Sequence, residues 1–198
     1  MLMRCQTAEE FVENRHELEE LGRWSELILG EPVSLEPPPS KHGTAVLNIA
    51  KALAEHVQRT TIGYACFELG LIVKRSPDSV YCPPISYFVS GSRWEEMDKA
   101  ITETRPALVV EIASSRDRRQ GLPHRVPLYL KWGVAVVWVV DTESRNVCVH
   151  TSSGTAMFEA NEYLEASPDW IGEGCEKPIL PGFKLAVKSV FREPDWMG

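Results

Sequence analysis

The chain has 198 residues, of which 43% are hydrophobic, and it carries a formal net charge of −7. This length and composition suit one domain over residues 1–198, and the acidic balance excludes a protein that holds nucleic acid over a broad basic face. The apolar runs fall short of the roughly 20 residues of a membrane span, and without a signal core or a CxxC pair we expect a cytoplasmic protein with reduced thiols and no membrane partner.

The first sixty residues predict two helices separated by an extended segment. Thr7 to Glu10 has the form of a capping box, with Thr7 as N-cap and Glu10 at N3, so a helix is expected over about 8–21. Residues 24–35 favour an extended conformation, and the three prolines that follow end it by removing backbone donors. A second helix, ending near Thr60, is predicted by four apolar residues at three- and four-residue steps: Val46, Ile49, Leu53 and Val57.

Strands dominate the central part of the sequence. Residues 64–73 and 107–113 are rich in β-branched and aromatic side chains and are bounded by turn signals, so both predict strands. A third strand is expected over 80–89, and it is weakened at Pro83-Pro84 because proline cannot donate to a β-ladder.

A short helix and two further strands are expected next. Proline suits a first helical turn and Gly133 suits a C-terminal stop, which predicts a helix over about 123–132. The continuous apolar run 134–140 predicts a buried strand that ends at Asp141, and 147–150 is expected to pair with it.

The order of these elements predicts an α/β fold with a mixed central β-sheet flanked by helices. Within the single domain we distinguish the N-terminal helix, a core over about 24–150 and a C-terminal extension over about 151–198.

One ionisable residue occupies an improbable place. Glu111 lies in the middle of the strand predicted over 107–113, where its neighbours on both faces are apolar. A carboxylate seldom occupies such a strand without a partner. Two interpretations remain open: Glu111 forms an ion pair with an arginine of the following segment, or it is a metal ligand.

An ordered set of motifs surrounds this glutamate. It comprises Pro106–Ser115, Asp117-Arg118, Arg125–Tyr129, Gly133-Val134 and Trp138–Asp141, with Gly30-Glu31, Pro37-Pro38, His42-Gly43 and Pro181–Phe183 outside this central group. The set covers about residues 7–191 and resembles the putative restriction endonuclease family of the PD-(D/E)XK superfamily. The resemblance implies a restriction-endonuclease-like core and metal-dependent hydrolysis of phosphodiester bonds, with DNA favoured over RNA as the substrate.

The resemblance also implies roles for individual residues. In the family, a strand aspartate and a glutamate bind a divalent cation, while a lysine orients or activates water. Glu111 matches the glutamate, and the carbonyl of Ile112 would be a neighbouring ligand of Mg or Mn, which prefer oxygen. Arg125 stands where members of the family place the lysine, and it would act as a cationic assistant.

Two positions depart from the family's pattern. Pro84 stands at the place of the aspartate, and Arg125 keeps the charge of the lysine but is effectively never neutral. Glu31, Glu68 and Asp78 are the candidates to supply the missing carboxylate. Glu31 is ranked first, as a further catalytic residue, because it matches a recurrent family position.

Contacts with nucleic acid are expected close to Glu111. Residues 105–131 carry six basic side chains against two acidic ones. Arg116, Arg118 and Arg119 would grip a phosphate backbone, or else form a charged loop paired with nearby carboxylates. His42 would contact a phosphate, or else cap the helix that follows it.

Two functions from different classes follow. The first is a metal-dependent endonuclease that acts on DNA and whose site is degenerate at Pro84 and Arg125. The second is a catalytically inactive nuclease-fold protein that serves as a binding or oligomerisation module. Nucleases of the superfamily frequently dimerise, so a homodimer is compatible with both.

Overall fold

The computed structural model describes residues 5–90, 93–168, 170–171 and 178–193. Its largest sheet is formed by β3 (Tyr64–Phe67), β6 (Ile85–Phe88), β8 (Leu108–Ala113), β9 (Val136–Asp141), β10 (Asn146–Thr151) and β11 (Gly154–Phe158). The six strands follow the order β11-β10-β9-β8-β6-β3. β8 and β9 run parallel and the other neighbours run antiparallel, so the sheet is mixed.

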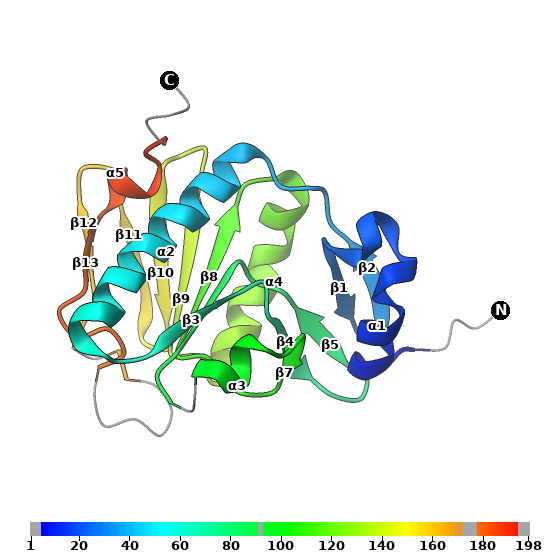
Figure 1. The fold of residues 1–198 in the computed structure, drawn as a ribbon. Helices are drawn as coiled ribbons and strands as arrows, with labels where there is room; N and C mark the ends of the chain where they lie inside the picture. Colours follow the sequence, from blue (N-terminus) through cyan, green and yellow to red (C-terminus); the bar gives the residue numbers. More distant parts are fainter. Residues whose placement is uncertain (1–4, 91–92, 169, 172–177, 194–198) are drawn as a thin grey trace.

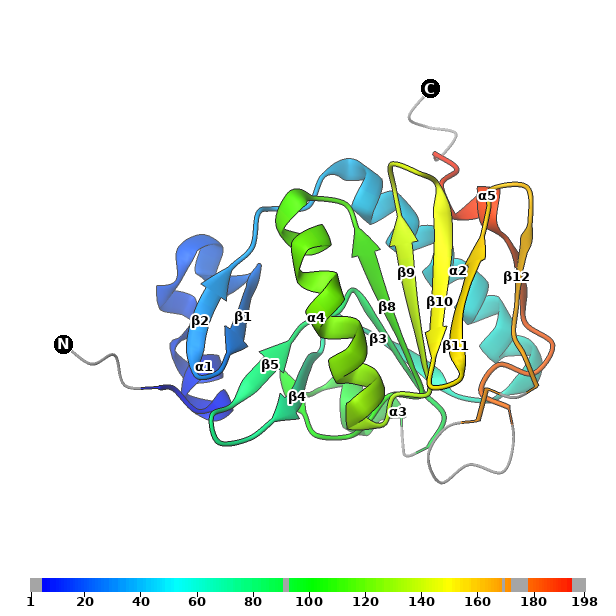
Figure 2. The ribbon, with the colours of Figure 1, turned by 180° about the vertical axis from the view of Figure 1, so that it is seen from behind.

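Two long helices cover opposite faces of this sheet (Figures 1 and 2). α2 (Ser40–Thr60) buries Ala45, Ile49 and Leu53 against one face, as the apolar periodicity predicts. α4 (Arg116–Trp132) lies on the other face, where Val126 and Tyr129 are buried. The prediction of a mixed central sheet flanked by helices is therefore confirmed.

A second sheet, which the sequence did not predict, lies on the side of α4. It contains β1 (Ser25–Ile28), β2 (Glu31–Ser34), β4 (Gly70–Lys74), β5 (Ser79–Tyr81) and β7 (Ile101–Thr102), in the order β2-β1-β5-β4-β7. Tyr129 of α4 packs in one cluster with residues of both sheets, such as Leu71 and Val109. The helix therefore has an apolar contact on each side.

Two strands predicted as continuous are divided between the two sheets. Residues 64–73 separate into β3 and β4 at Glu68, which has a positive φ of 53°. Residues 80–89 separate into β5 and β6 across Pro83-Pro84. The chain thus passes between the sheets at both places, because a left-handed residue and a proline pair each interrupt a ladder.

The limits of two helices differ from those predicted. The capping box at Thr7 is present, but α1 (Ala8–Asn14) gives way to 3-10 turns at Arg15–Glu17 and Glu19–Gly22, not to a helix reaching 21. In the other direction, α4 begins at Arg116, seven residues before 123. The remaining elements are α3 (Arg93–Met97), β12 (Tyr163–Glu165), β13 (Lys184–Ala186) and α5 (Val187–Val190).

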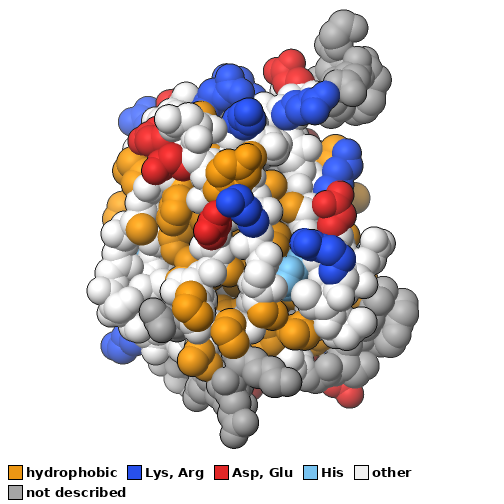
Figure 3. Space-filling view, turned by 90° about the vertical axis from the view of Figure 1, so that its left-hand side faces the viewer, with side chains coloured by type: hydrophobic (Ala, Val, Ile, Leu, Met, Phe, Trp, Pro, Cys, Tyr) orange, Lys and Arg blue, Asp and Glu red, His pale blue; other side chains and the backbone are white. Residues whose placement is uncertain are grey.

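The end of the molecule that carries β12 exposes apolar side chains between charged ones (Figure 3). Met157, Tyr163 and Ile171 are among its exposed residues, and Lys184 lies over the Tyr163 ring. No helix among the described residues is both long and apolar enough to span a bilayer. Cys5, Cys66, Cys82 and Cys148 are free, whereas Cys175 lies outside the described residues.

Candidate functional site

Glu111 is buried on the central strand β8, whose six residues are all buried. Only 3% of Glu111 is exposed, and its carboxylate faces α4. Oε1 accepts a hydrogen bond of 2.8 Å from the hydroxyl of Tyr129 and lies 3.5 Å from Nη1 of Arg125. Arg125 and Tyr129 are four residues apart on one helix, so both side chains reach the same side of the sheet.

Arg125 is bound more tightly by a carboxylate of the other sheet. Its two terminal nitrogens donate to Glu26 of β1, at 2.9 Å to Oε1 and 2.6 Å to Oε2. Glu26 is 1% exposed and also accepts a hydrogen bond of 3.1 Å from the backbone N–H of Cys82. We call Glu26, Glu111, Arg125 and Tyr129 the arginine–carboxylate cluster.

The cluster places two carboxylates around one guanidinium. Burial raises the pKa of Glu26 to about 7, the charge of Arg125 opposes this rise, and the charge of Glu111 adds to it. Burial also disfavours the charged form of Arg125, but Glu111 and Glu26 outweigh it and raise the pKa of Arg125. Burial and the charge of Glu111 raise the pKa of Tyr129 well above its usual value, so its hydroxyl remains a donor.

Pro84 lies directly beside Glu111 in the sheet. β6 and β8 pair Ile85 with Val110, and one further step in this antiparallel register sets Pro84 opposite Glu111. On its other side, Pro84 accepts a hydrogen bond of 3.4 Å from the backbone N–H of Glu68. Pro84 therefore occupies the place from which a second carboxylate would face Glu111.

The acidic residues expected to compensate for Pro84 do not gather around Glu111. Glu31 is exposed at the start of β2, with no contact to Glu111 within the described part of the chain. Asp78 accepts from the backbone N–H groups of Ala8 and Ser76 and from Arg75, so it fixes a turn.

Glu68 comes nearest to the cluster in electrostatic terms. Glu68 is exposed, yet desolvation of its carboxyl group by the surrounding protein raises its pKa; the charge of Arg118 opposes the rise and that of Glu111 adds to it. Its backbone is nevertheless two strand spacings from that of Glu111, about 9 to 10 Å. The backbone of Glu68 is therefore not directly beside that of Glu111, as the backbone of Pro84 is.

Glu26 is the member of the cluster that sequence reasoning did not single out. Its signal resembles that of Glu111, because it is a carboxylate in a short extended run next to Leu27 and Ile28. The prediction favoured Glu31, five residues later, on the strength of the motif Gly30-Glu31. The register of β1 with β2 turns Glu26 inward and leaves Glu31 at the exposed turn of the hairpin.

The three arginines at the start of α4 have different environments. Arg116 is exposed. Arg119 forms a two-point ion pair with Asp141, at 2.6 and 2.9 Å, so its terminal nitrogens are already occupied. Arg118 is 7% exposed and has a weak contact of 3.5 Å with the carbonyl of Glu36. Of the three, Arg118 is the buried cation without a carboxylate partner among the described residues.

His42 lies at the start of α2 and is 4% exposed. Its Nδ1 is 2.9 Å from the hydroxyl of Ser114, directly after β8. Burial, with a contribution from the charge of Arg118, lowers the pKa of His42 to about 4, so the ring is neutral at physiological pH. His42 is thereby close to Arg118 and to the end of β8.

The residues present do not fit a divalent metal ion. Both oxygens of Glu26 are bound by Arg125, Oε1 of Glu111 is bound by Tyr129, and the carbonyl of Ile112 accepts from the N–H of Ser114 at 2.9 Å. No three His, Cys, Asp or Glu residues of the described ranges are placed to share an ion. The guanidinium of Arg125 provides the positive charge between the carboxylates.

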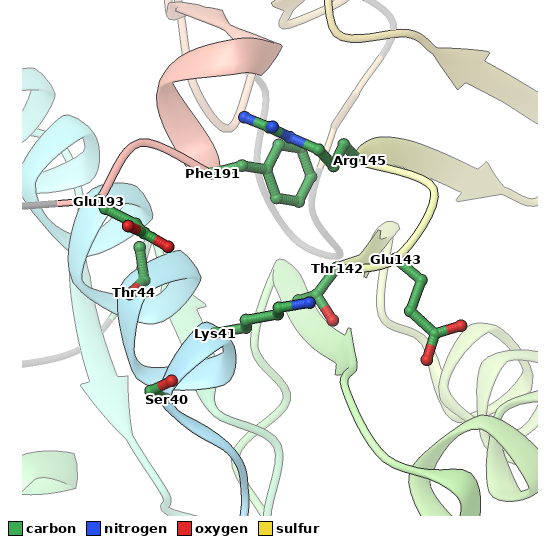
Figure 4. Close-up of a pocket in the computed structure, with 8 residues that line it drawn as sticks. All are labelled: Ser40, Lys41, Thr44, Thr142, Glu143, Arg145, Phe191 and Glu193. Atoms are coloured by element: carbon green, nitrogen blue, oxygen red, sulfur yellow. The ribbon is translucent and has the colours of Figure 1, made fainter.

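A solvent-open pocket of about 180 Å³ lies beside the first turn of α2 (Figure 4). The first turn of α2, the β9–β10 turn and the chain after α5 line it with Ser40, Lys41, Thr44, Thr142, Glu143, Arg145, Phe191 and Glu193. None of these residues belongs to the arginine–carboxylate cluster.

Comparison with known proteins supports a relationship along most of the chain. The sequence profile of a family described as "Uma2: Putative restriction endonuclease" matches residues 8–188. A crystal structure of a putative nuclease belonging to DUF820, from Anabaena variabilis ATCC 29413, is similar, with a TM-score of 0.68 and 22% sequence identity. The match covers 93% of this chain and 97% of that chain, which shows a shared fold. The comparison with curated proteins gave no match.

Proposed function

The chain belongs to the Uma2 family of putative restriction endonucleases, and from this premise we propose that it is a nuclease-fold protein which binds nucleic acid without hydrolysing it through a bound metal ion. DNA is the expected ligand before RNA. Mg or Mn, which the family resemblance implies, is not a resident cofactor of this chain in the proposal. The second function expected from the sequence, an inactive binding module, is thus the one that the cluster supports best.

The single observation that supports this proposal is the two-point ion pair between Arg125 and Glu26. A metal-dependent site needs carboxylates that are free to bind the cation. Here one carboxylate is neutralised by a buried arginine, the second is shared with it, and Pro84 supplies none. Breaking a buried pair of this kind costs about 3 to 5 kcal/mol. A weakly bound dication would not offset that cost.

Hydrolysis with Glu111 as the metal ligand and Arg125 as the cationic assistant is the competing expectation. It requires Arg125 to leave Glu26 and turn toward a phosphate, while Glu111 exchanges Tyr129 for the ion. Glu31, the additional catalytic residue expected from the sequence, would have to leave the hairpin turn of β1 and β2. We therefore expect no activity from this arrangement.

A plasmid-nicking assay with Mg or Mn tests the proposal. We expect the wild-type protein to leave supercoiled DNA intact, and Pro84→Asp combined with Arg125→Lys to gain metal-dependent nicking. In that variant, the introduced aspartate faces Glu111, and lysine cannot bind both oxygens of Glu26 as a planar guanidinium does. The gain should disappear when Glu111→Ala is added. Nicking by the wild-type protein that is abolished by Glu111→Ala would refute the proposal.

Calorimetry with Mn provides a second measurement on the same variants. The wild-type protein should release no binding heat, and Pro84→Asp with Arg125→Lys should bind about one ion. A folded double variant that binds no Mn would show that the carboxylates have been placed wrongly.

A further inference from the structure

Arg118 is an unusual residue in the interior of this protein. It is 7% exposed, and its Nε has no hydrogen-bond partner in the described part of the chain. Arg119 and Arg125, on the same helix, both form two-point pairs with carboxylates. Arg118 has no such pair. Buried charges are normally paired because their transfer from water is costly. The carboxylates of Glu68 and Asp117 act on Arg118 electrostatically, but none among the described residues forms an ion pair with it, so its guanidinium lacks a directly bound anion.

The neighbouring carboxylate does not provide that anion. Asp117 accepts hydrogen bonds from the hydroxyl of Ser115 and from the backbone N–H groups of Glu36 and Arg118. It therefore satisfies the start of α4 and the segment before α2. The guanidinium of Arg118 is left with the Glu36 carbonyl at 3.5 Å and the Trp24 ring at 6.0 Å.

A second buried donor lies close to Arg118. Nε2 of His42 is buried and has no partner among the described residues, while Nδ1 is 2.9 Å from the hydroxyl of Ser114. When that hydroxyl donates to Nδ1, the ring proton resides on Nε2. The neutral imidazole then presents an N–H group without an acceptor.

The two residues meet where two helices begin. Figures 1 and 2 both show α2 and α4 starting beside the carboxyl end of β8. Two contacts hold the starts together: the N–H of Glu36, before α2, donates to the Asp117 carboxylate, and Arg118 of α4 donates to the Glu36 carbonyl at 3.5 Å. The start of α2 has no side-chain cap, although the N–H of His42 already donates to the carbonyl of Pro39 at 2.9 Å, so the helix dipole and the remaining first-turn N–H groups also favour an anion. Ligands of α/β sheets commonly bind beyond the carboxyl ends of strands.

We propose that Arg118 and His42 form a binding site for a phosphate-type oxyanion at the junction of α2 and α4. Arg118 donates from its guanidinium, His42 donates from Nε2, and the first turn of α2 contributes backbone N–H groups. The anion is a phosphodiester of nucleic acid or a free phosphate group, which share this chemistry. The site does not use the arginine–carboxylate cluster, so it is independent of whether that cluster hydrolyses anything.

Thermal unfolding in the presence of inorganic phosphate tests the site, with NaCl added to hold ionic strength constant. A concentration about ten times the Kd should raise the Tm of the wild-type protein by about 3 °C. Arg118→Met should show no rise. Without phosphate, its Tm should equal or exceed that of the wild type, because the variant removes an unpaired buried charge. A structural role for Arg118 predicts a lower Tm instead.

Two matched variants separate this site from general electrostatics. Arg116→Gln removes the same charge from an exposed position two residues away and should keep the phosphate-induced rise. His42→Gln can place an amide N–H near the position of Nε2 and should retain most of the rise, whereas His42→Phe should lose it. Equal losses in Arg116→Gln and Arg118→Met, or no rise in the wild type, would overturn the proposal.

A labelled DNA duplex in EDTA distinguishes the two sources of the anion, because cleavage is then excluded. If the ligand is a phosphodiester, fluorescence anisotropy should show at least tenfold weaker binding by Arg118→Met and less than a twofold change by Arg116→Gln. If only inorganic phosphate binds at Arg118, the site serves a free phosphate group. Nicking by the wild-type protein would refute the proposed function and leave this result unchanged.

Discussion

At the scale of single residues, the two buried carboxylates of the arginine–carboxylate cluster share a guanidinium as their counter-charge. Arg125 is planar and binds both oxygens of Glu26, which a lysine cannot do. It also lies near Glu111, so one guanidinium serves two acidic groups. The sequence singled out Glu111 by its place within an apolar strand, and the family resemblance singled out Arg125. Neither revealed Glu26, whose partner is 99 residues away.

The first prediction concerns the loss of this guanidinium. Arg125→Met should lower the free energy of unfolding by about 3 to 5 kcal/mol at pH 7.5, because two buried carboxylates lose their counter-charge. The pKa of Glu26, already raised by burial, then rises further above its unfolded value because the opposing charge of Arg125 is gone, so the folded state binds this proton first. Stability should therefore recover as the pH falls toward 5. Urea unfolding at the two pH values measures both effects.

Arg119→Met is the control for that experiment. Arg119 also forms a two-point pair on α4, but Arg119 and Asp141 are both partly exposed, so its loss should cost about 0 to 1 kcal/mol. Equal losses for the two variants, or no recovery of Arg125→Met in acid, would contradict the account of the cluster.

A second prediction concerns His42 and acid. The pKa of His42 is lowered in the folded state to about 4, against about 6.5 in the unfolded chain. The unfolded state thus binds the proton first, and stability is lost as the pH falls from 6.5 to 4. The full loss approaches about 3 kcal/mol. In phosphate-free buffer, the stability difference between wild type and His42→Gln should shift by this amount across that window.

Glu26 has the opposite effect on the pH dependence of stability. Because its pKa is raised in the folded state, the folded protein gains stability as the pH falls through 7. The comparison with His42→Gln removes this contribution because both proteins contain Glu26. A difference that stays constant from pH 7 to pH 4 would show that His42 is not buried in its neutral form.

At the scale of elements, α4 brings the important side chains together. Arg118, Arg125 and Tyr129 are separated by seven and four residues, so they form one buried stripe on α4, in which Arg125 and Tyr129 contact the carboxylates of the cluster. The predicted start near 123 assumed that prolines begin helices. The helix instead starts at Arg116 and continues through Pro123 and Pro127, which are exposed. Packing of the buried stripe offsets the unfavourable helix propensity of proline.

That explanation predicts a gain from removing a proline. Pro127→Ala restores a helical N–H on the exposed face of α4, and the gain is reduced by the greater freedom of the unfolded chain. We expect the free energy of unfolding to rise by about 1 to 2 kcal/mol. Pro39→Ala, just before α2 and equally exposed, should give no comparable gain. Urea unfolding measures both variants. A loss of stability in Pro127→Ala would contradict the view that packing of α4 offsets the effect of its prolines.

At the scale of the whole molecule, the sequence predicted the central sheet but did not predict that some strands belong to a second sheet. Apolar periodicity identified α2, a run rich in β-branched residues identified β8 and a continuous apolar run identified β9, and these elements are confirmed. The passages between sheets at Glu68 and Pro83-Pro84 depend on which strands pair, and pairing is set by contacts distant in sequence. The single-domain organisation, cytoplasmic location and homodimer remain predictions; light scattering of the purified protein tests the last.

The pair between Arg125 and Glu26 makes the central cation a part of the polypeptide. A metal ion is held in proportion to its concentration, competes with other metals and can be stripped by a chelator. The guanidinium is present once per molecule in every chain that is translated. The link between the two sheets is therefore indifferent to EDTA, to metal starvation and to the choice of metal in the medium. The positive charge between the two carboxylates is therefore always present and cannot exchange with the medium.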